Sequence, residues 1–320
     1  MDESHTHWEG VDASYKTLIA EFPSSLHDVA AMLPHQLGLV ARAGDLWEGF
    51  IHLSPNRDLP GFAAEAVAAA SGRPLSPEML ARFRRAHCCA GFFGLLCDRL
   101  ADGQVADTPD LRALRQLFLR KWRQTLIAAT GAPRSCEKAL RAAVTAWHRG
   151  VTLEQAACTE RELSPNSYGR ILLLKLRWIG TTAEVLLHAC GAGRRASAFR
   201  RAHNLLLLSL QCVDDYHDVK EDQETRGISI PDALGLPAVG VARAAPRLAR
   251  QGSSEARAAG FTRLADWLDE RAAALDLALL PESSPQAELA GMVLATVLVE
   301  CAYPVRPHAP ESATVRLPSR

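Results

Sequence analysis

The chain has 320 residues, 36 basic and 36 acidic side chains, and a sequence pI near 7.2. This balance excludes an overall basic field of the kind that binds nucleic acid or an anionic membrane. Hydrophobic residues make up 48% of the chain but aromatic residues only 6%, which favours helices over strands. The eight cysteines show neither the spacing of a zinc site nor a disulfide framework, so we expect reduced thiols in a cytoplasmic protein.

Helical periodicity recurs along the chain, and no alternating strand pattern interrupts it. Residues 1–13 and 304–320 predict flexible tails, and the acidic N-terminus is unlike a signal peptide. Between them, residues 14–303 predict one all-α domain, an antiparallel helical bundle. In chain order, the expected helices cover 25–33, 36–51, 60–71, 76–102, 110–130, 135–149, 152–162, 166–191, 195–224, 237–251, 255–279 and 285–303. The apolar stretch 291–303 is too short to span a bilayer, so no stable membrane insertion is expected.

An acidic segment between Asp214 and Asp222 carries the strongest functional signal, with five carboxylates in nine residues. On one helix, Asp214, Asp218 and Asp222 follow one another at one-turn spacing, and Asp215 lies on the same side. Like charges at this spacing repel one another, so a cation is expected among them. Mg²⁺ is the simplest candidate because it prefers carboxylate oxygen.

A second acidic pair is expected to face this segment, because metal sites in helical bundles draw ligands from more than one helix. Asp98 and Asp102 lie one turn apart at the end of an apolar helix, where the chain turns at Gly103. Two helices that are apolar in the middle and acidic at the end predict a site at the mouth of an apolar cavity.

The residues around the acidic segment resemble a known motif. Gln211 precedes the DDxxD sequence 214–218 by three positions, Asp222 follows it by four, and Arg226-Gly227 comes later. This pattern resembles the second aspartate-rich motif of trans-isoprenyl diphosphate synthases, and its continuation is similar to squalene and phytoene synthases. Both belong to the class I isoprenoid synthase superfamily, which also contains the terpene cyclases. The resemblance covers about residues 75–235 and implies an all-α bundle around a central apolar cavity.

The resemblance implies metal-assisted chemistry on a prenyl diphosphate. Several Mg²⁺ ions, or Mn²⁺ in their place, would stabilise the departing diphosphate. The implied metal ligands are Asp98, Asp102, Asp214, Asp215, Asp218 and Asp222, of which Asp98, Asp102, Asp214 and Asp218 would be catalytic. The first motif departs from the family pattern because Arg99 stands at its second position. This charge predicts an altered metal number or a direct contact with the diphosphate.

The resemblance also implies side chains that hold the rest of the substrate. Terpene cyclases use an arginine upstream of the second motif as a diphosphate sensor, and Arg170 matches that spacing better than Arg177. The expected diphosphate-binding residues are Arg170, Lys220, Arg226 and Gln211. An allylic carbocation survives only between dry apolar or aromatic walls, so the expected cavity residues are Phe92, Phe93, Trp178 and Tyr216. For these aromatic rings, ordinary core packing is the alternative.

Motifs that are absent from the sequence indicate which branch of the superfamily the chain resembles. Chain-elongating synthases normally carry Arg-Arg-Gly soon after the first motif and a basic segment near the N-terminus, and residues 103–107 contain no arginine. A single diphosphate site predicts cyclisation of a linear C10–C20 prenyl diphosphate, as in a terpene synthase. The usual cyclase second motif is also missing, so a prenyltransferase that uses an acceptor is the alternative. Head-to-head condensation is a third, weaker choice.

Two further interpretations involve no catalysis. The acidic segment could be a solvated helix face balanced by Lys220 and Arg226. The chain could also be an inactive helical scaffold that lost ionisation through Arg99. No nucleic-acid partner is expected, and a homodimer would fit the superfamily.

Overall fold

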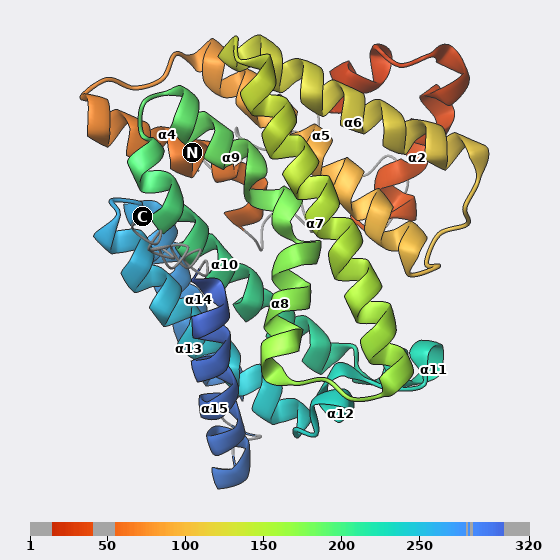
Figure 1. Ribbon diagram of the computed structural model, residues 1–320, viewed down its shortest axis with the longest axis vertical. Coiled ribbons are helices and arrows are strands. Elements are labelled where there is room, and N and C mark those ends of the chain that lie inside the picture. Colours follow the sequence, from red (N-terminus) through yellow and green to blue (C-terminus); the bar gives the residue numbers. More distant parts are fainter. Residues whose placement is uncertain (1–14, 41–54, 280, 282–283, 304–320) are drawn as a thin grey trace, which may run out of the picture.

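The computed structural model describes residues 15–40, 55–279, 281 and 284–303, and every element assigned in these ranges is helical. The all-α bundle expected from the sequence is therefore confirmed (Figure 1). The predicted tails 1–13 and 304–320 lie outside the described residues, as does most of the predicted helix 36–51. The described part of that helix, 37–40, is a turn that follows α2 (His27–Gln36).

Four long helices begin at a Ser-Pro or Thr-Pro pair: α5 (Pro77–Ala101), α6 (Pro109–Thr130), α8 (Pro165–Lys175) and α15 (Pro285–Ala302). In each, the hydroxyl oxygen of the first residue accepts a hydrogen bond from the backbone N–H three positions on. The proline supplies the helical φ and has no N–H to leave unsatisfied. This local chemistry explains why these starts were predicted to within about one residue.

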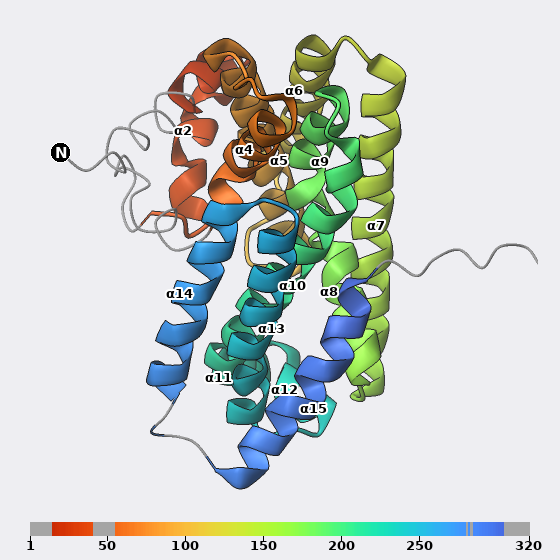
Figure 2. The ribbon, with the colours of Figure 1, turned by 90° about the vertical axis from the view of Figure 1, so that its left-hand side faces the viewer.

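The bundle has two hydrophobic cores. The larger one lies among α4 (Leu59–Ser71), α5, α6, α9 (Arg177–Ala189) and the first half of α10 (Gly193–His217). The second lies among α8, the end of α10, α13 (Ala238–Ala258) and α15, and α14 (Thr262–Leu279) packs against α13. Figure 2 shows α13 between α14 and α15. The two short helices α11 (Val219–Arg226) and α12 (Ile230–Leu234) follow α10.

Two predicted breaks are absent: one at 252–254, where α13 continues to Ala258, and one at 150–151. The expected helices 135–149 and 152–162 form a single helix, α7 (Pro133–Glu160). Gly150, which lies between them, is buried, and a Cβ at this position would lie 2.8 Å from Lys175. The glycine therefore permits close approach of α8 and is not a helix terminator.

Three predicted helices are divided. The expected helix 166–191 is interrupted at Leu176, between α8 and α9, and the expected helix 195–224 at Asp218. The expected helix 255–279 is divided at 259–261, between α13 and α14. At Leu176 and at Asp218 a single residue with ψ near 0° separates the two pieces. Periodicity alone does not detect a break of one residue, because the helical spacing of the side chains continues across it.

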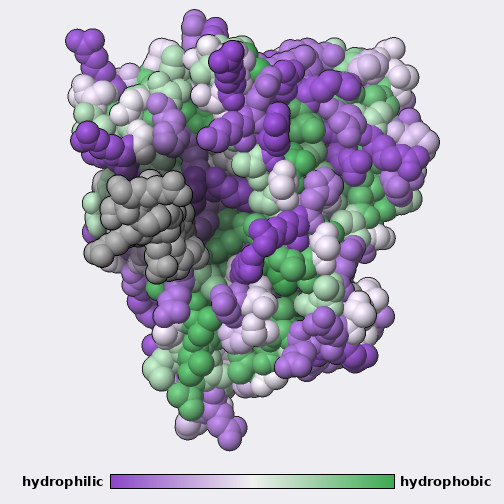
Figure 3. All heavy atoms as spheres, in the orientation of Figure 1, coloured by the Kyte–Doolittle hydropathy of each residue, from purple (hydrophilic) through white to green (hydrophobic). Residues whose placement is uncertain are grey.

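α15 leaves apolar side chains on the surface (Figure 3). Leu289, Met292 and Val293 are 58%, 45% and 51% exposed. Within the described ranges, α15 is the helix long and apolar enough to cross a bilayer by length and composition. Core helices of soluble bundles meet the same criterion, and α15 packs against α13 and α8.

Candidate functional site

Both acidic segments line one cavity of about 450 Å³. Its lining includes every aspartate expected to bind metal, together with Gln211: Asp98 and Asp102 from the end of α5, and Asp214, Asp215, Asp218 and Asp222 from α10 and α11. The segments are more than 100 positions apart in the chain. The structure therefore brings together the two clusters that the sequence paired.

The second acidic segment keeps helical spacing across the division at Asp218. The backbone N–H of Asp218 donates to the carbonyl of Asp214 at 2.9 Å, and that of Asp222 donates to the carbonyl of Asp218 at 2.8 Å. The carboxylates thus stay one turn apart although α10 ends at His217. Burial, together with the charge of Asp218, raises the pKa of Asp214, which is the repulsion expected of like charges at this spacing.

Asp215 is held on both of its carboxylate oxygens. The buried Tyr168 hydroxyl of α8 donates to Oδ2, and Gln211 Nε2 donates to Oδ1 at 2.9 Å. Burial raises the pKa of Asp215 to about 7, although both hydrogen bonds act in the opposite direction. Asp215 therefore fits a residue that positions its neighbours better than a direct metal ligand.

The raised pKa of Asp215 predicts that it makes stability depend on pH. In the unfolded chain this carboxyl loses its proton near pH 4, whereas in the folded protein it keeps it until about pH 7. The unfolded state binds fewer protons in that window, so the Asp215 contribution to the free energy of unfolding falls as pH rises, by at most about 1.4 kcal/mol per unit. We expect Asp215→Asn to gain stability relative to the wild type between pH 5 and pH 8 in urea unfolding. A difference that does not change with pH would contradict this assignment.

Lys175 is a buried cation on the other side of the cavity that the sequence reasoning did not assign. Its ammonium group lies 3.3 Å from Asp98 Oδ1 and 2.6 Å from Glu154 Oε2 on α7. Burial opposes the charged form, but Asp98, Glu154 and Asp102 outweigh it, so the pKa of Lys175 is raised. Both Lys175 and Glu154 line the cavity.

The position of Lys175 on the cavity face of α8 could have been predicted from helical periodicity. Tyr168, Ile171, Leu172 and Lys175 follow the pattern i, i+3, i+4 and i+7 on α8, and all four line the cavity. Arg170 is off this face, is exposed and is not among the described lining residues. The expectation that Arg170 reaches the diphosphate is therefore not supported by its position.

Of the other basic residues considered in the sequence, Arg99 lines the cavity and Lys220 does not. Arg99 lines the cavity, donates to Gln104, and its charge acts to lower the pKa of Asp214. Lys220 is 88% exposed and pairs with Glu224 at 3.8 Å, away from the lining. The side chain of Arg226 lies outside the described residues.

None of the four aromatic residues expected in the cavity wall belongs to the described lining, namely Phe92, Phe93, Trp178 and Tyr216. Phe92 stacks on Tyr15 and Phe118 in the larger core, with ring centroids 4.4 and 5.1 Å apart. Trp178 is buried against Gly94. The structure therefore does not support their expected role as cavity walls: these rings are near the motifs in sequence, but Phe92 and Phe93 belong to the larger core and Trp178 packs against Gly94. The apolar part of the wall is formed by the ring of Tyr168 and by aliphatic side chains, namely Leu95, Ala157, Leu163, Ile171, Leu172, Leu176, Ile228, Ile230 and Ala233.

The acidic residues fit divalent ions in part. Among the described residues, no group of three His, Cys, Asp or Glu side chains converges on one metal position. Mg²⁺ is commonly held by one or two carboxylates together with substrate phosphates. Asp214, Asp218 and Asp222 fit that mode, because they line the cavity at one-turn spacing. Asp98 fits it less well, because Lys175 already lies beside it.

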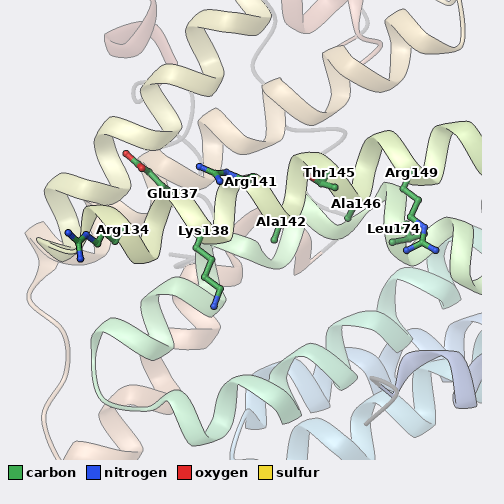
Figure 4. A pocket seen from close by; sticks show the side chains of 9 residues that line it. All are labelled: Arg134, Glu137, Lys138, Arg141, Ala142, Thr145, Ala146, Arg149 and Leu174. Carbon is green, nitrogen blue, oxygen red and sulfur yellow. The ribbon is translucent and has the colours of Figure 1, made fainter. Parts of the chain in front are cut away.

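A second, larger groove of about 590 Å³ runs along the outer face of α7 (Figure 4). Its lining is mainly basic: Arg134, Lys138, Arg141 and Arg149. The carboxylate in its described lining, Glu137, forms an ion pair with Arg123. Mg²⁺ is bound through carboxylate oxygens, so the acidic cavity is the better candidate for a magnesium site.

Comparison with known proteins supports the fold. No protein-family model and no curated protein sequence matches the chain. Among solved structures, the chain is similar to a polyprenyl synthetase from Streptomyces coelicolor A3(2), with a TM-score of 0.52 and 15% sequence identity. The match covers 91% of this chain and 96% of that one. At this identity the likeness shows the fold alone: the chain shares the all-α fold of that polyprenyl synthetase.

Proposed function

We propose that the chain is a Mg²⁺-dependent enzyme that ionises a linear prenyl diphosphate, releases diphosphate and directs the carbocation to a terpene product. The observation that carries the proposal is the shared cavity, in which two acidic segments meet a buried lysine and aliphatic walls. Bound Mg²⁺ would supply Lewis-acid stabilisation of the departing diphosphate. A cytoplasmic location fits this proposal and remains a prediction.

We assign three roles to the residues of the cavity: metal binding, diphosphate binding and exclusion of water. Asp214 and Asp218 would hold the divalent ions, and Tyr168 with Gln211 keeps Asp215 fixed behind them. Lys175 and Arg99 would donate to diphosphate oxygens. The aliphatic walls, including Leu172, would exclude water from the cation.

Cyclisation is favoured over condensation by the small number of cations. Lys175 and Arg99 are the Lys and Arg side chains among the described lining residues, which suits one diphosphate group better than two. The second candidate is a prenyltransferase. It is favoured by the DDxxD form of the second motif and by the structural neighbour, whose name is polyprenyl synthetase.

One incubation series tests the proposal. We expect diphosphate release from at least one of the C10, C15 and C20 linear prenyl diphosphates, with no release after Mg²⁺ is chelated. A cyclic hydrocarbon or alcohol formed from one substrate alone supports cyclisation. Turnover that requires isopentenyl diphosphate or another acceptor supports the transferase. If none of the three substrates releases diphosphate, the inactive scaffold is favoured.

A further inference from the structure

We propose that Lys175 takes the place of a divalent ion at the first acidic motif, so that divalent ions bind on the Asp214–Asp222 side of the cavity alone. The inference rests on the proposed function for its substrate class, a diphosphate. It goes beyond that function because it states which positive charges near the diphosphate come from side chains and which come from metal ions.

The position of the ammonium group is incompatible with a metal ion in the same place. Lys175 Nζ lies within 3.3 Å of Asp98 and 2.6 Å of Glu154. A Mg²⁺ ion shared by these carboxylates would need their oxygens at about 2.0–2.1 Å, in the space that Nζ occupies. The lysine side chain is only 9% exposed, so it cannot move into solvent without giving up its packing.

The surrounding helices are shaped around this lysine. Gly150 of α7 faces it, and a Cβ there would lie 2.8 Å from both Lys175 Cγ and its backbone nitrogen. Because Gly150 has no side chain, the aliphatic part of Lys175 fits between α7 and α8. Glu154, one turn later on α7, then receives the ammonium group. These contacts show that the packing of α7 and α8 holds Lys175 in this position, unlike a solvent-exposed lysine.

Arg99 extends the same arrangement. It belongs to the first motif, lines the same cavity as Lys175 and donates a hydrogen bond to Gln104. The first-motif side of the cavity therefore carries two cations, of which Lys175 lies beside Asp98 and Glu154. A diphosphate on this side would meet N–H donors directly, and such charge-assisted hydrogen bonds need no bridging metal.

Counting bound Mn²⁺ tests the inference. The free ion would be measured by electron paramagnetic resonance during titration of the full chain in the presence of inorganic diphosphate. We expect Asp98→Asn to bind as many ions per chain as the wild type and Asp218→Asn to bind at least one fewer. Lys175→Met should bind one more, because Asp98 and Glu154 then lack their cation. Lys138→Met, an exposed lysine on α7, is the matched control and should change nothing.

Three results would overturn the inference: loss of an ion in Asp98→Asn, no additional ion in a folded Lys175→Met, or no Mn²⁺ bound beside diphosphate in the wild type. If Lys175→Met does not fold, as judged by its helical circular dichroism, the Asp98→Asn comparison still decides. The measurement needs no turnover. Failure of the proposed function, seen as no release from prenyl diphosphates, is therefore distinguishable from failure of this inference.

Discussion

Asp218→Ala should abolish diphosphate release while leaving the helical circular dichroism signal intact. Asp218 lines the cavity between α10 and α11, and its position is fixed by backbone hydrogen bonds to Asp214 and from Asp222. Losing a metal-binding carboxylate removes several kcal/mol of stabilisation of the departing diphosphate. A loss of about 4 kcal/mol corresponds to about a 10³-fold lower rate.

Glu224→Ala is the matched control for this prediction. Glu224 is also acidic and lies within α11, six positions further on, but it is exposed and pairs with Lys220 outside the cavity. It should retain wild-type turnover, measured as diphosphate released from the best substrate of the C10–C20 series. If Asp218→Ala keeps full activity, the assignment of the second acidic segment to the metal site is wrong.

The sequence predicts the parts of this molecule that depend on local chemistry. The Ser-Pro and Thr-Pro helix starts and the one-turn spacing of Asp214 and Asp218 are properties of short segments, and the structure has them. That both acidic segments line one cavity follows from the same logic, because each ends an apolar helix. The breaks at Leu176 and Asp218 each involve a single residue with ψ near 0°, and a pattern of apolar side chains does not register a break that short.

The cavity residues were predicted poorly because nearness in sequence was used in place of helical phase. On α5, Leu95, Asp98 and Asp102 share one face and line the cavity, whereas Phe93 lies on the opposite face. Phe92 shares the phase of Leu95 but lies one turn further from the acidic pair, where it stacks on Tyr15 and Phe118 in the larger core. The same reasoning on α8 selects Lys175 over Arg170. Glu154 had no such signal, since its relation to Asp98 exists only once α7 has packed beside α5 and α8.

A contact between Gly94 of α5 and Trp178 of α9 sets the distance between these two helices close to the candidate site. A Cβ built on Gly94 would lie 2.1–2.4 Å from three carbons of the buried Trp178 ring. Gly94 precedes Asp98 by about one turn on α5, and Trp178 follows Lys175 by three positions. A residue larger than glycine at position 94 must therefore push α5 away from α9 near the site.

Gly94→Ala should lower the free energy of unfolding by about 3 kcal/mol, since overpacking of a filled core typically costs 1–3 kcal/mol. Gly91→Ala is the matched control on the same helix: a Cβ there meets nothing within 4 Å, so it should stabilise the protein by about 0.5–1 kcal/mol. Urea unfolding measures both effects. In a Trp178→Leu background the cost of Gly94→Ala should shrink by more than about 1 kcal/mol, because the two positions are in direct contact. An equal cost in both backgrounds would show that the ring does not set the spacing of α5 and α9.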